Sequence, residues 1–236
     1  MILDESVKLA ITNHAKEQFP RESCGLVIIF KGRQQYRKCN NLGVGTDNFI
    51  LDPLDYEKAD TEGEIVAVIH SHPNVSVKPS QADLVACEAS GLPWFIIGLP
   101  SEQWSYIEPT GYIAPLVGRT WSHGVLDCYA IIRDWYKQER NIELPDFHRS
   151  DEWWKRGENL YMENFEKAGF KEIRQEELSY GDCILMTIGS SVPNHGALYL
   201  GDGVILHHVQ NRLSTREIFG GYYLKNATGY YRYENS

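Results

Sequence analysis

The sequence predicts a mixed α/β (α+β) protein of two domains. Its 236 residues fit two small domains or one large one. Helical and strand-like segments alternate along the chain, and a candidate metal site and a candidate thiol site lie in different halves. Two unrelated chemistries favour two domains. Hydrophobic residues make up 42% of the chain, with 14 Tyr and 6 Trp, which predicts packed cores and not disorder.

The first half alternates helices with short strands. Residues 4–19 predict a helix, because apolar residues recur at helical spacing and Pro20 follows them. The continuous apolar run at residues 25–30 predicts a buried strand. The other predicted elements of this half are strands over 35–39, 48–51, 65–69, 94–97 and 103–107, and helices over 53–59 and from 79–80 to Gly91.

A boundary is predicted within residues 110–120, which contain two glycines and one proline. The resulting domains are 1–112 and 113–236. The elements predicted for the second domain are helices over 128–137 and 160–168, and strands over 182–188, 196–200, 204–209, 222–224 and 230–233.

Charge and cysteine content exclude several classes of protein. With 32 acidic and 23 basic residues, the net charge of −9 argues against nucleic-acid binding and against docking on an anionic membrane. Neither a secretory signal nor a stretch long enough for membrane insertion is found in the sequence. The five cysteines are widely spaced and form no Cys-x-x-Cys pair. Synthesis and folding in a reducing cytoplasm are therefore expected.

The first half contains a candidate metal site. His70 and His72 follow a predicted strand two positions apart, so both imidazoles should point to one side. Asp83 lies three residues after Ser80 on a predicted helix, which places both over one face. Two imidazoles and one carboxylate form a common catalytic zinc shell with one position open to water. Glu22 is a candidate for the group that takes and returns the proton.

Each of these elements also has an ordinary interpretation. A His-x-His pair is often incidental. Ser80 and Asp83 resemble a helix capping box. Glu22 follows Arg21 and could form a solvated ion pair. The joint spacing is what favours a catalytic centre over these alternatives.

The combined pattern of Glu22, His70-Ser71-His72-Pro73 and Ser80-Gln81-Ala82-Asp83 resembles the JAMM metalloprotease signature. The resemblance covers roughly residues 1–110 and implies a cytidine-deaminase-type α/β domain. It implies one Zn²⁺ ion held by His70, His72 and Asp83, with Glu22 as general acid and base and Ser80 as a stabiliser of the oxyanion. Members of that family cleave peptide or isopeptide bonds next to ubiquitin-like proteins.

The second half contains a candidate nucleophile, Cys128, at the start of a predicted helix. Free N–H groups at a helix N-terminus favour a thiolate and can form an oxyanion hole. The preceding Asp127 opposes this unless it caps the helix. The alternative is an inert buried cysteine, which is how we interpret the other four. These are Cys24, Cys39, Cys87 and Cys183.

Histidines on a predicted hairpin are candidates for the base. His195 begins one strand, and a glycine-rich turn at residues 201–203 leads to the next. A three-residue loop places His207 diagonal to His195, whereas a two-residue loop brings His208 round instead. The strand register therefore decides the third member, and the sequence leaves it open.

The pattern of Asp127-Cys128, His195, Gly201-Asp202-Gly203 and His207 resembles the NlpC-type cell-wall peptidases, which have a papain-like α+β fold. The resemblance implies Cys128 as nucleophile, His195 as base and His207 as the residue that orients the base. Such enzymes cleave γ-D-glutamyl–diamino acid links in peptidoglycan stem peptides. The Tyr and paired glycines often found before the nucleophile are replaced here by residues 118–124, which suggests a differently shaped pocket.

The fusion of the two domains is similar to a family of tail assembly proteins of lambda-like phages. The resemblance implies a two-headed hydrolase that acts at the virion tail tip on the bacterial cell wall. Its zinc site would process a ubiquitin-like domain of another tail protein, and its thiol site would cleave a peptidoglycan stem peptide. Other tail-tip proteins would be partners. The alternatives are a structural tail-tip component with inactive centres, and a host-type deubiquitylase-like protease.

Overall fold

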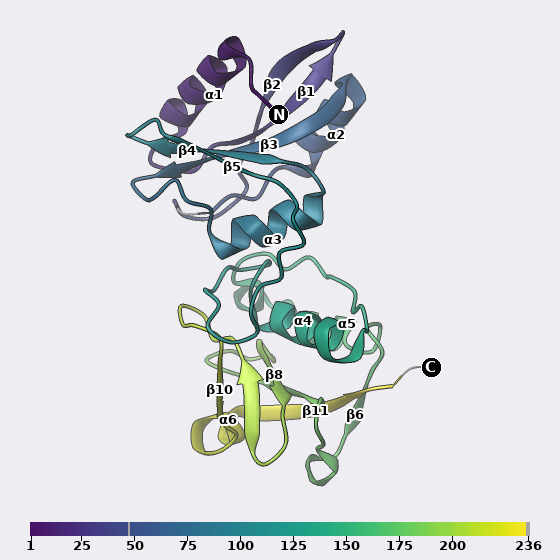
Figure 1. Cartoon of the computed structure of the whole chain (residues 1–236). Coiled ribbons are helices and arrows are strands. Elements are labelled where there is room, and N and C mark those ends of the chain that lie inside the picture. Colours follow the sequence, from purple (N-terminus) through teal and green to yellow (C-terminus); the bar gives the residue numbers. More distant parts are fainter. Residues whose placement is uncertain (47, 235–236) are drawn as a thin grey trace. The chain divides into compact units, whose positions relative to one another are not determined.

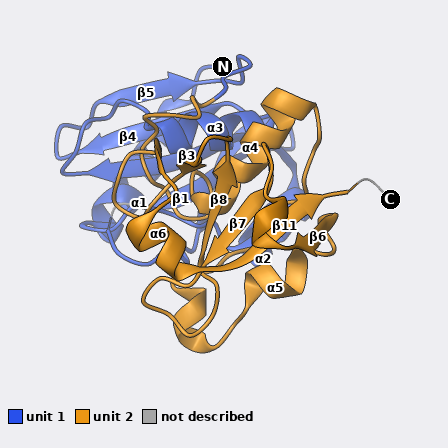
Figure 2. Cartoon of the chain, turned by 90° about the horizontal axis from the view of Figure 1, so that it is seen from below, with its two compact units in different colours: residues 1–113 blue, residues 114–236 orange. Residues whose placement is uncertain are grey.

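A computed structural model describes residues 1–46 and 48–234 of the chain (Figure 1). It divides the chain into two compact units, Met1–Ile113 and Ala114–Ser236 (Figure 2). Each unit has its own β-sheet and its own hydrophobic core. Among the described residues, no helix is long and apolar enough to cross a membrane.

The first unit is built on a five-stranded sheet in the order β2-β1-β3-β4-β5. Neighbouring strands are antiparallel except for β3 and β4, which run parallel. Its elements are α1 (Glu5–Gln18), β1 (Cys24–Phe30), β2 (Arg33–Cys39), α2 (Pro53–Glu62), β3 (Glu64–Pro73), α3 (Gln81–Ser90), β4 (Trp94–Leu99) and β5 (Trp104–Ile107).

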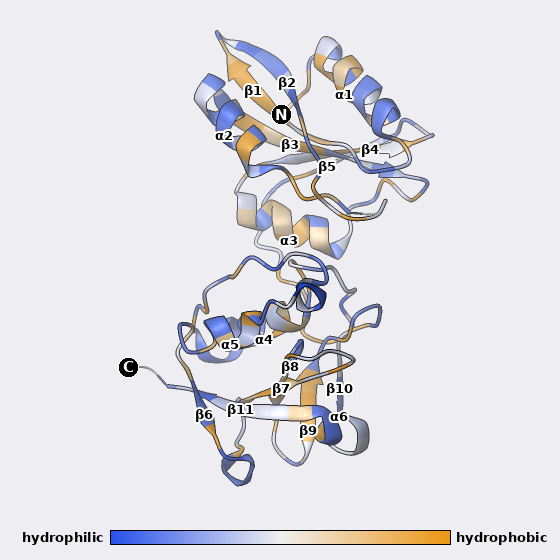
Figure 3. Ribbon diagram, turned by 180° about the vertical axis from the view of Figure 1, so that it is seen from behind, coloured by the Kyte–Doolittle hydropathy of each residue, from blue (hydrophilic) through white to orange (hydrophobic). Residues whose placement is uncertain are grey.

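The central strands of this sheet are buried on both faces. Alternate residues of β1 face different cores: Val27 packs against α1, whereas Leu26 and Ile28 pack against α2 and α3. The hydrophobic colouring of β1 reflects this (Figure 3). α1 therefore covers one face of the sheet, and α2 and α3 cover the other face.

Two predictions for this half need correction. Residues 48–51 do not form a strand, because only a single bridge joins Leu51 to Asn41. The predicted strand at 65–69 is longer in the structure and continues through His70 and His72 to Pro73. Pairing with β4 extends this far, with His72 beside Gly98.

The second unit is built on a six-stranded antiparallel sheet in the order β10-β9-β8-β7-β11-β6. The helix α4 packs on one face, against β8 and β9. Its elements are α4 (Cys128–Arg140), η1 (Trp153–Arg156), α5 (Leu160–Asn164), β6 (Phe170–Ile173), η2 (Gln175–Glu177), β7 (Cys183–Met186), β8 (His195–Tyr199), β9 (Val204–His207), β10 (Thr215–Ile218), α6 (Gly221–Asn226) and β11 (Ala227–Tyr233).

Aromatic packing dominates the core beneath α4. Trp135 and Tyr136 of this helix are buried together with Phe165 and Phe170, and the rings of the last two stack with centroids 4.5 Å apart. A smaller core on the opposite face contains Ile184 and its neighbours. The sheet is thus covered on both faces, and this packing holds in place the strands β8 and β9, which carry His195 and His207.

Several predictions for this half also need correction. The predicted strand at 222–224 is wrong, because these residues lie in the short helix α6. The helix predicted over 160–168 ends at Asn164. The strands β6 and β10 were not predicted at all; each has four residues and lies at an edge of the sheet.

Candidate metal and thiol sites

The candidate metal ligands meet where β3 and α3 come together. The Nε2 atoms of His70 and His72 are 3.1 Å apart, so both rings point to one side of the strand, as predicted. Asp83 joins them from the first turn of α3. Its Oδ1 lies 3.2 Å from His70 Nε2, and its Oδ2 lies 3.4 Å from His72 Nε2. All three residues are buried.

These positions fit a tetrahedral zinc shell. Ligand atoms about 2.0–2.1 Å from zinc in a tetrahedron lie about 3.3 Å from one another. The two histidine Nε2 atoms are 3.1 Å apart, and they lie 3.2 Å and 3.4 Å from the Oδ1 and Oδ2 atoms of Asp83, respectively. His72 Nδ1 donates to the backbone oxygen of Ser76 at 2.8 Å, which leaves the Nε2 lone pair for a metal. The donor set of two imidazoles and one carboxylate is one that zinc prefers.

Asp83 has two roles in the local structure. Ser80 Oγ accepts from the Asp83 N–H at 3.1 Å, and Asp83 Oδ2 accepts from the Ser80 N–H at 2.6 Å. The two residues therefore form the capping box that was the ordinary interpretation, and the same carboxylate also faces the histidines. Burial raises the pKa of Asp83, but the hydrogen bonds from His70 and His72 outweigh it and hold that pKa well below its usual value.

Glu22 is placed beside the histidines by strand pairing. It lies two residues before β1, whose Cys24 is the partner of His70. The Ser71 N–H donates to the Ser23 oxygen at 3.0 Å, which extends this pairing toward Glu22. The Glu22 side chain is buried, and its charge is among the influences that raise the pKa of His72. The carboxylate thus lies within electrostatic reach of the metal ligands.

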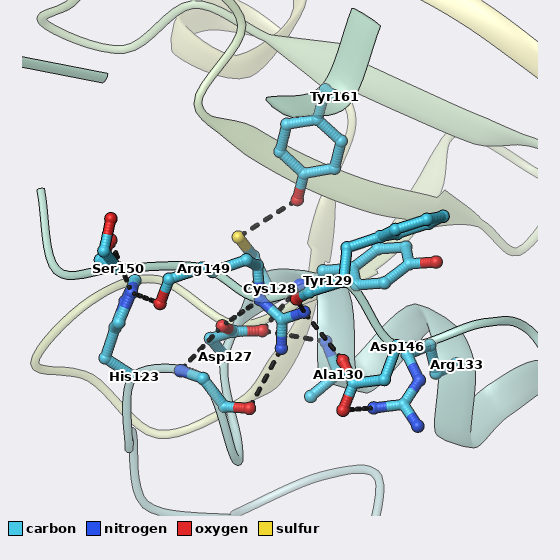
Figure 4. Close-up of polar contacts among 12 residues, drawn as sticks. His123, Asp127, Cys128, Tyr129, Ala130, Arg133, Asp146, Arg149, Ser150 and Tyr161 are labelled. Atoms are coloured by element: carbon cyan, nitrogen blue, oxygen red, sulfur yellow. Dashed lines mark hydrogen bonds and ion pairs between the residues drawn. The ribbon is translucent and has the colours of Figure 1, made fainter. Parts of the chain in front are cut away.

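Cys128 is the first residue of α4, as predicted. Asp127 is the helix N-cap, and its Oδ1 accepts from the N–H groups of Tyr129 and Ala130 at 3.0 and 2.9 Å. Its Oδ2 pairs with Arg149 Nε at 2.8 Å (Figure 4). The Asp127 carboxylate therefore caps the helix, and its negative charge is balanced by the Arg149 guanidinium.

The Cys128 sulfur faces the hydroxyl of Tyr161, with 3.2 Å between Sγ and Oη (Figure 4). A Cβ atom added to Gly196 would lie 2.8 Å from the same hydroxyl, so only glycine leaves room for it there. Burial raises the pKa of the Cys128 thiol to about 11, and Asp127 adds to the rise, whereas the Tyr161 bond lowers it.

His195 and His207 form a pair, with 3.0 Å between His195 Nε2 and His207 Nδ1. The turn has three residues, since the Leu200 N–H donates to Val204 across it and Ala197 pairs with His207. This is the register that brings His207, and not His208, to His195. His208 turns away and its Nε2 contacts the Arg212 oxygen at 3.0 Å.

Cys128 and His195 line one cavity of about 250 Å³. Burial and the nearby His207 lower the pKa of His195 to about 3. Both shifts favour the neutral forms of the thiol and the imidazole. Four aromatic residues also line this cavity: Trp121, Trp153, Trp154 and Tyr161.

Three residues near the thiol site were missed at the sequence level. Arg149 lies in a segment without regular structure, Tyr161 lies in the short helix α5, and Glu217 lies on the unpredicted strand β10. None belongs to a local motif, because each contact joins parts of the chain that are distant in sequence. For Arg149, the single available signal was a cation in an aromatic-rich stretch.

Comparison with known proteins agrees with the two-unit structure. Residues 4–106 match the family model of prokaryotic homologs of the JAB domain, and residues 117–232 match the model of the NlpC/P60 family. The tail tip assembly protein K of Escherichia phage N15 is 33% identical over 229 residues, which cover 96% of this chain and 93% of that protein. The chain belongs to the tail tip assembly protein K family.

The protein K of Escherichia phage lambda is 42% identical over 167 residues, which cover 71% of this chain and 81% of that protein. Among solved structures, a JAB1/MPN domain protein from Archaeoglobus fulgidus is 20% identical, with a TM-score of 0.31, over 46% of this chain and 90% of that one. An NlpC/P60 family protein from Bacillus cereus is 16% identical, with a TM-score of 0.33, over 94% of this chain and 66% of that one.

Membership of the protein K family confirms the resemblance found in the sequence. The JAB-like and NlpC/P60 units also confirm the predicted fold class, a mixed α/β chain with a metallopeptidase-like first domain and a papain-like second domain. Both matched families are hydrolases, and the prediction of a peptidase-type enzyme is confirmed at that level.

Proposed function

We propose that this protein is a two-headed hydrolase of the phage tail tip. The observation that carries the proposal is the joint placement of Cys128 and His195 in one cavity, with His195 bonded to His207. The cluster of His70, His72 and Asp83 in the other unit supports the second activity. The names of the two relatives support a place in the tail tip and other tail proteins as partners.

The thiol site is proposed to cleave peptide links in peptidoglycan stem peptides. His195 takes the proton of the Cys128 thiol as the sulfur attacks the scissile carbonyl carbon. The Cys128 N–H at the start of α4 stabilises the resulting oxyanion, because the N–H groups of Tyr129 and Ala130 already donate to the Asp127 carboxylate. His195 then gives its proton to the leaving amine, and the C–N bond breaks to leave a thioester. A water molecule, deprotonated by His195, releases the acid product and restores the thiol.

The zinc site is proposed to cleave a peptide or isopeptide bond next to a ubiquitin-like domain of another tail protein. When bound, zinc would supply a Lewis acid that activates water and polarises the carbonyl. Glu22 receives the water proton and passes it to the leaving amine. The Ser80 hydroxyl accepts the Asp83 N–H and keeps its own hydrogen to donate to the oxyanion.

Digestion of purified peptidoglycan and of a synthetic tetrapeptide stem tests the thiol activity. The whole protein should release new amino and carboxyl termini, identified by mass spectrometry. Cys128→Ala should abolish the release while bound zinc stays unchanged. Cys87→Ala is the matched control, because Cys87 is a buried cysteine of the other unit. Cleavage that survives in Cys128→Ala would refute this assignment.

The zinc activity needs a separate substrate. A fusion of a ubiquitin-like tail domain to a reporter should be cut by the protein with zinc, and not by Glu22→Gln. Cys128→Ala should cut it at the normal rate. Cleavage of a ubiquitin fusion with no cleavage of the tail-domain fusion or peptidoglycan would favour the host-type deubiquitylase-like alternative.

A structural role with a silent thiol is the second candidate. It is favoured by one observation: the Cys128 side chain is buried and its pKa is raised to about 11. In that case the isolated protein leaves peptidoglycan intact, and Cys128→Ala supports tail assembly as well as the native chain does. A plaque assay that complements a phage lacking this protein separates the two candidates.

A further inference from the structure

A carboxylate on the sheet edge extends the row of polar side chains at the thiol site. We propose that Glu217 is a positioning residue that fixes the tautomers of His207 and His195 and so leaves His195 ready to accept the thiol proton. The inference rests on the proposed peptidase function of this site. It concerns a residue that the resemblance to cell-wall peptidases does not include.

Strand pairing places Glu217 on the same face as His207. β10 pairs with β9 so that Glu217 is the partner of Ile205 and Thr215 is the partner of His207. Because side chains alternate along a strand, these four residues share one face of the sheet. Glu217 Oε1 lies 3.8 Å from His207 Nε2. The Glu217 side chain keeps 29% of its exposure, whereas the His207 side chain is fully buried.

The nitrogen that faces Glu217 has no other hydrogen-bond partner among the described residues. His207 Nε2 is fully buried and makes no hydrogen bond there, while His207 Nδ1 is bonded to His195. Burying a polar nitrogen without a partner costs free energy. The nearby carboxylate is an acceptor, and a movement of less than 1 Å would bring it within about 3.0 Å, a normal hydrogen-bond distance.

The two possible proton arrangements have opposite consequences for catalysis. If Nε2 of His207 carries the hydrogen, then Nδ1 of His207 is an acceptor and His195 Nε2 must donate to it. A neutral His195 then has its lone pair on Nδ1. That nitrogen is the one not used by His207, and it is free to take a proton from Cys128.

The reverse arrangement disables the base. If His207 donates from Nδ1, its Nε2 lone pair faces the Glu217 carboxylate, which is repulsive. His195 would accept at Nε2 and carry its hydrogen on Nδ1, where it cannot take a proton. Glu217 therefore favours the productive arrangement, which is the role a carboxylate plays toward the histidine of a serine peptidase.

Other charged and titratable groups around the pair do not replace Glu217. Arg212 is a cation that pairs with Glu217 itself, with 3.9 Å between Nη1 and Oε1. The Tyr223 ring packs edge-on against His207 with centroids 4.7 Å apart. His208 contacts the Arg212 backbone oxygen, and Cys128 lines the same cavity as His195. Among the described residues, Glu217 is the acid that ion-pairs with His207.

Nitrogen-15 NMR of the imidazoles tests the inference without any substrate. In the full-length protein at pH 7, His207 should carry its hydrogen on Nε2 and His195 should carry its own on Nε2. Glu217→Ala should convert a measurable fraction of both rings to the Nδ1–H form. Glu217→Gln should preserve the native tautomers in part, since its amide oxygen can still accept. Unchanged tautomers in Glu217→Ala would overturn the proposal.

Kinetics provide the second measurement. Glu217→Ala should lower kcat by about 10- to 100-fold with little change in KM, because a tautomer-fixing residue does not bind substrate. Glu217→Gln should lower kcat by a smaller factor. Glu172→Ala, which removes an exposed acid from the opposite edge strand β6, is the matched control and should be unaffected. An equal loss in both alanine variants would mean that Glu217 is merely structural.

The peptidase function and the role of Glu217 are tested by separate measurements. If the native protein does not cleave peptidoglycan, the proposed function fails, yet the NMR measurement still decides the role of Glu217. Alkylation of Cys128 by iodoacetamide at pH 8 gives a further readout that needs no peptide. It should slow several-fold in Glu217→Ala, and an unchanged rate would contradict the link to the thiol.

Discussion

Arg149 reaches back to Asp127, the residue immediately before the nucleophile, and the two form a buried ion pair with 2.8 Å between Nε and Oδ2. The Arg149 guanidinium also donates to the Gly124 and Phe147 oxygens. These bonds satisfy both charges, so the helix that presents Cys128 is anchored to a segment with no regular structure. The ion pair gives that segment a direct role in the thiol site.

Removing one member of this pair should destabilise the second unit. Arg149→Met should lower the free energy of unfolding by about 3–5 kcal/mol, because the Asp127 carboxylate would remain buried without its partner. Urea denaturation followed by Trp fluorescence measures the change. Arg156→Met is the control: its ion pair with Glu158 is half exposed, and the expected loss is below about 1 kcal/mol. Similar losses in both variants would contradict the assigned role of Arg149.

The Tyr161 hydroxyl should tune the nucleophile. It lowers the pKa of Cys128, so Tyr161→Phe should raise that pKa above about 11 and slow alkylation of the thiol several-fold at pH 8. The rate of iodoacetamide modification between pH 7 and 10 measures this, and in the native protein it should still be rising at pH 10. Tyr129→Phe is a suitable control, because its hydroxyl donates to the Pro145 oxygen and not to sulfur. Faster alkylation in Tyr161→Phe would show that the hydroxyl opposes the thiolate.

The hairpin register predicts unequal effects for two neighbouring histidines. His207→Ala should impair peptidoglycan cleavage far more than His208→Ala, because His207 contacts His195 and His208 contacts the Arg212 backbone. Initial rates on a stem peptide, with circular dichroism to confirm folding, make the comparison. A larger loss in His208→Ala would mean that the strands pair differently in solution.

Metal binding should depend on His72. His72→Ala should lose the bound zinc and lower the melting temperature of the first unit, since two remaining ligands rarely retain the metal. Metal analysis of the purified protein gives the answer. His14→Ala is a matched control, because His14 is a buried histidine of the same unit that bonds to Tyr36. One equivalent of zinc retained by His72→Ala would refute the ligand assignment.

Buried histidines should make the second unit less stable in mild acid. The pKa of His195 falls from 6.5 to about 3 on folding, so the unfolded chain binds a proton first as the pH drops. The contribution of His195 to the free energy of unfolding is fully present above pH 6.5. Below pH 6.5 the free energy of unfolding should decrease by up to about 1.4 kcal/mol per pH unit. Denaturation curves at pH 7, 6 and 5 measure the slope. His195→Gln should reduce this dependence of stability on pH. An identical slope in that variant would mean that other groups cause the effect.

The sequence predicted what depends on local pattern. The positions of His70, His72 and Asp83 follow from strand and helix periodicity, and the structure brings these three side chains together. The start of α4 at Cys128 follows from the capping residue Asp127 in the same way. The two interpretations of the Ser80–Asp83 pair turned out to be compatible, because one carboxylate serves the cap and also faces the histidines.

Long-range pairing was not predictable from the same patterns. Residues 222–224 are aromatic and apolar, which favours a strand, but Gly220 caps the short helix α6 there and Gly221 is its first residue. β10 has the sequence Thr-Arg-Glu-Ile, whose exposed edge position leaves no apolar run to detect. Glu217 was missed for that reason, and Arg149 was missed because its partner lies in another segment of the chain.

The turn at residues 201–203 has a consequence for how such proteins can diverge. Asp202 adopts a positive φ of 51°, as do the glycines on either side of it, so the backbone conformation favours small or Asn-like residues. Substitutions that respect this conformation leave the strands in register. Inserting or deleting one residue would rotate every later side chain of β9 to the opposite face and exchange His207 for His208. This hairpin can therefore tolerate changes of composition during evolution, whereas a change of length would change which histidine lies beside His195.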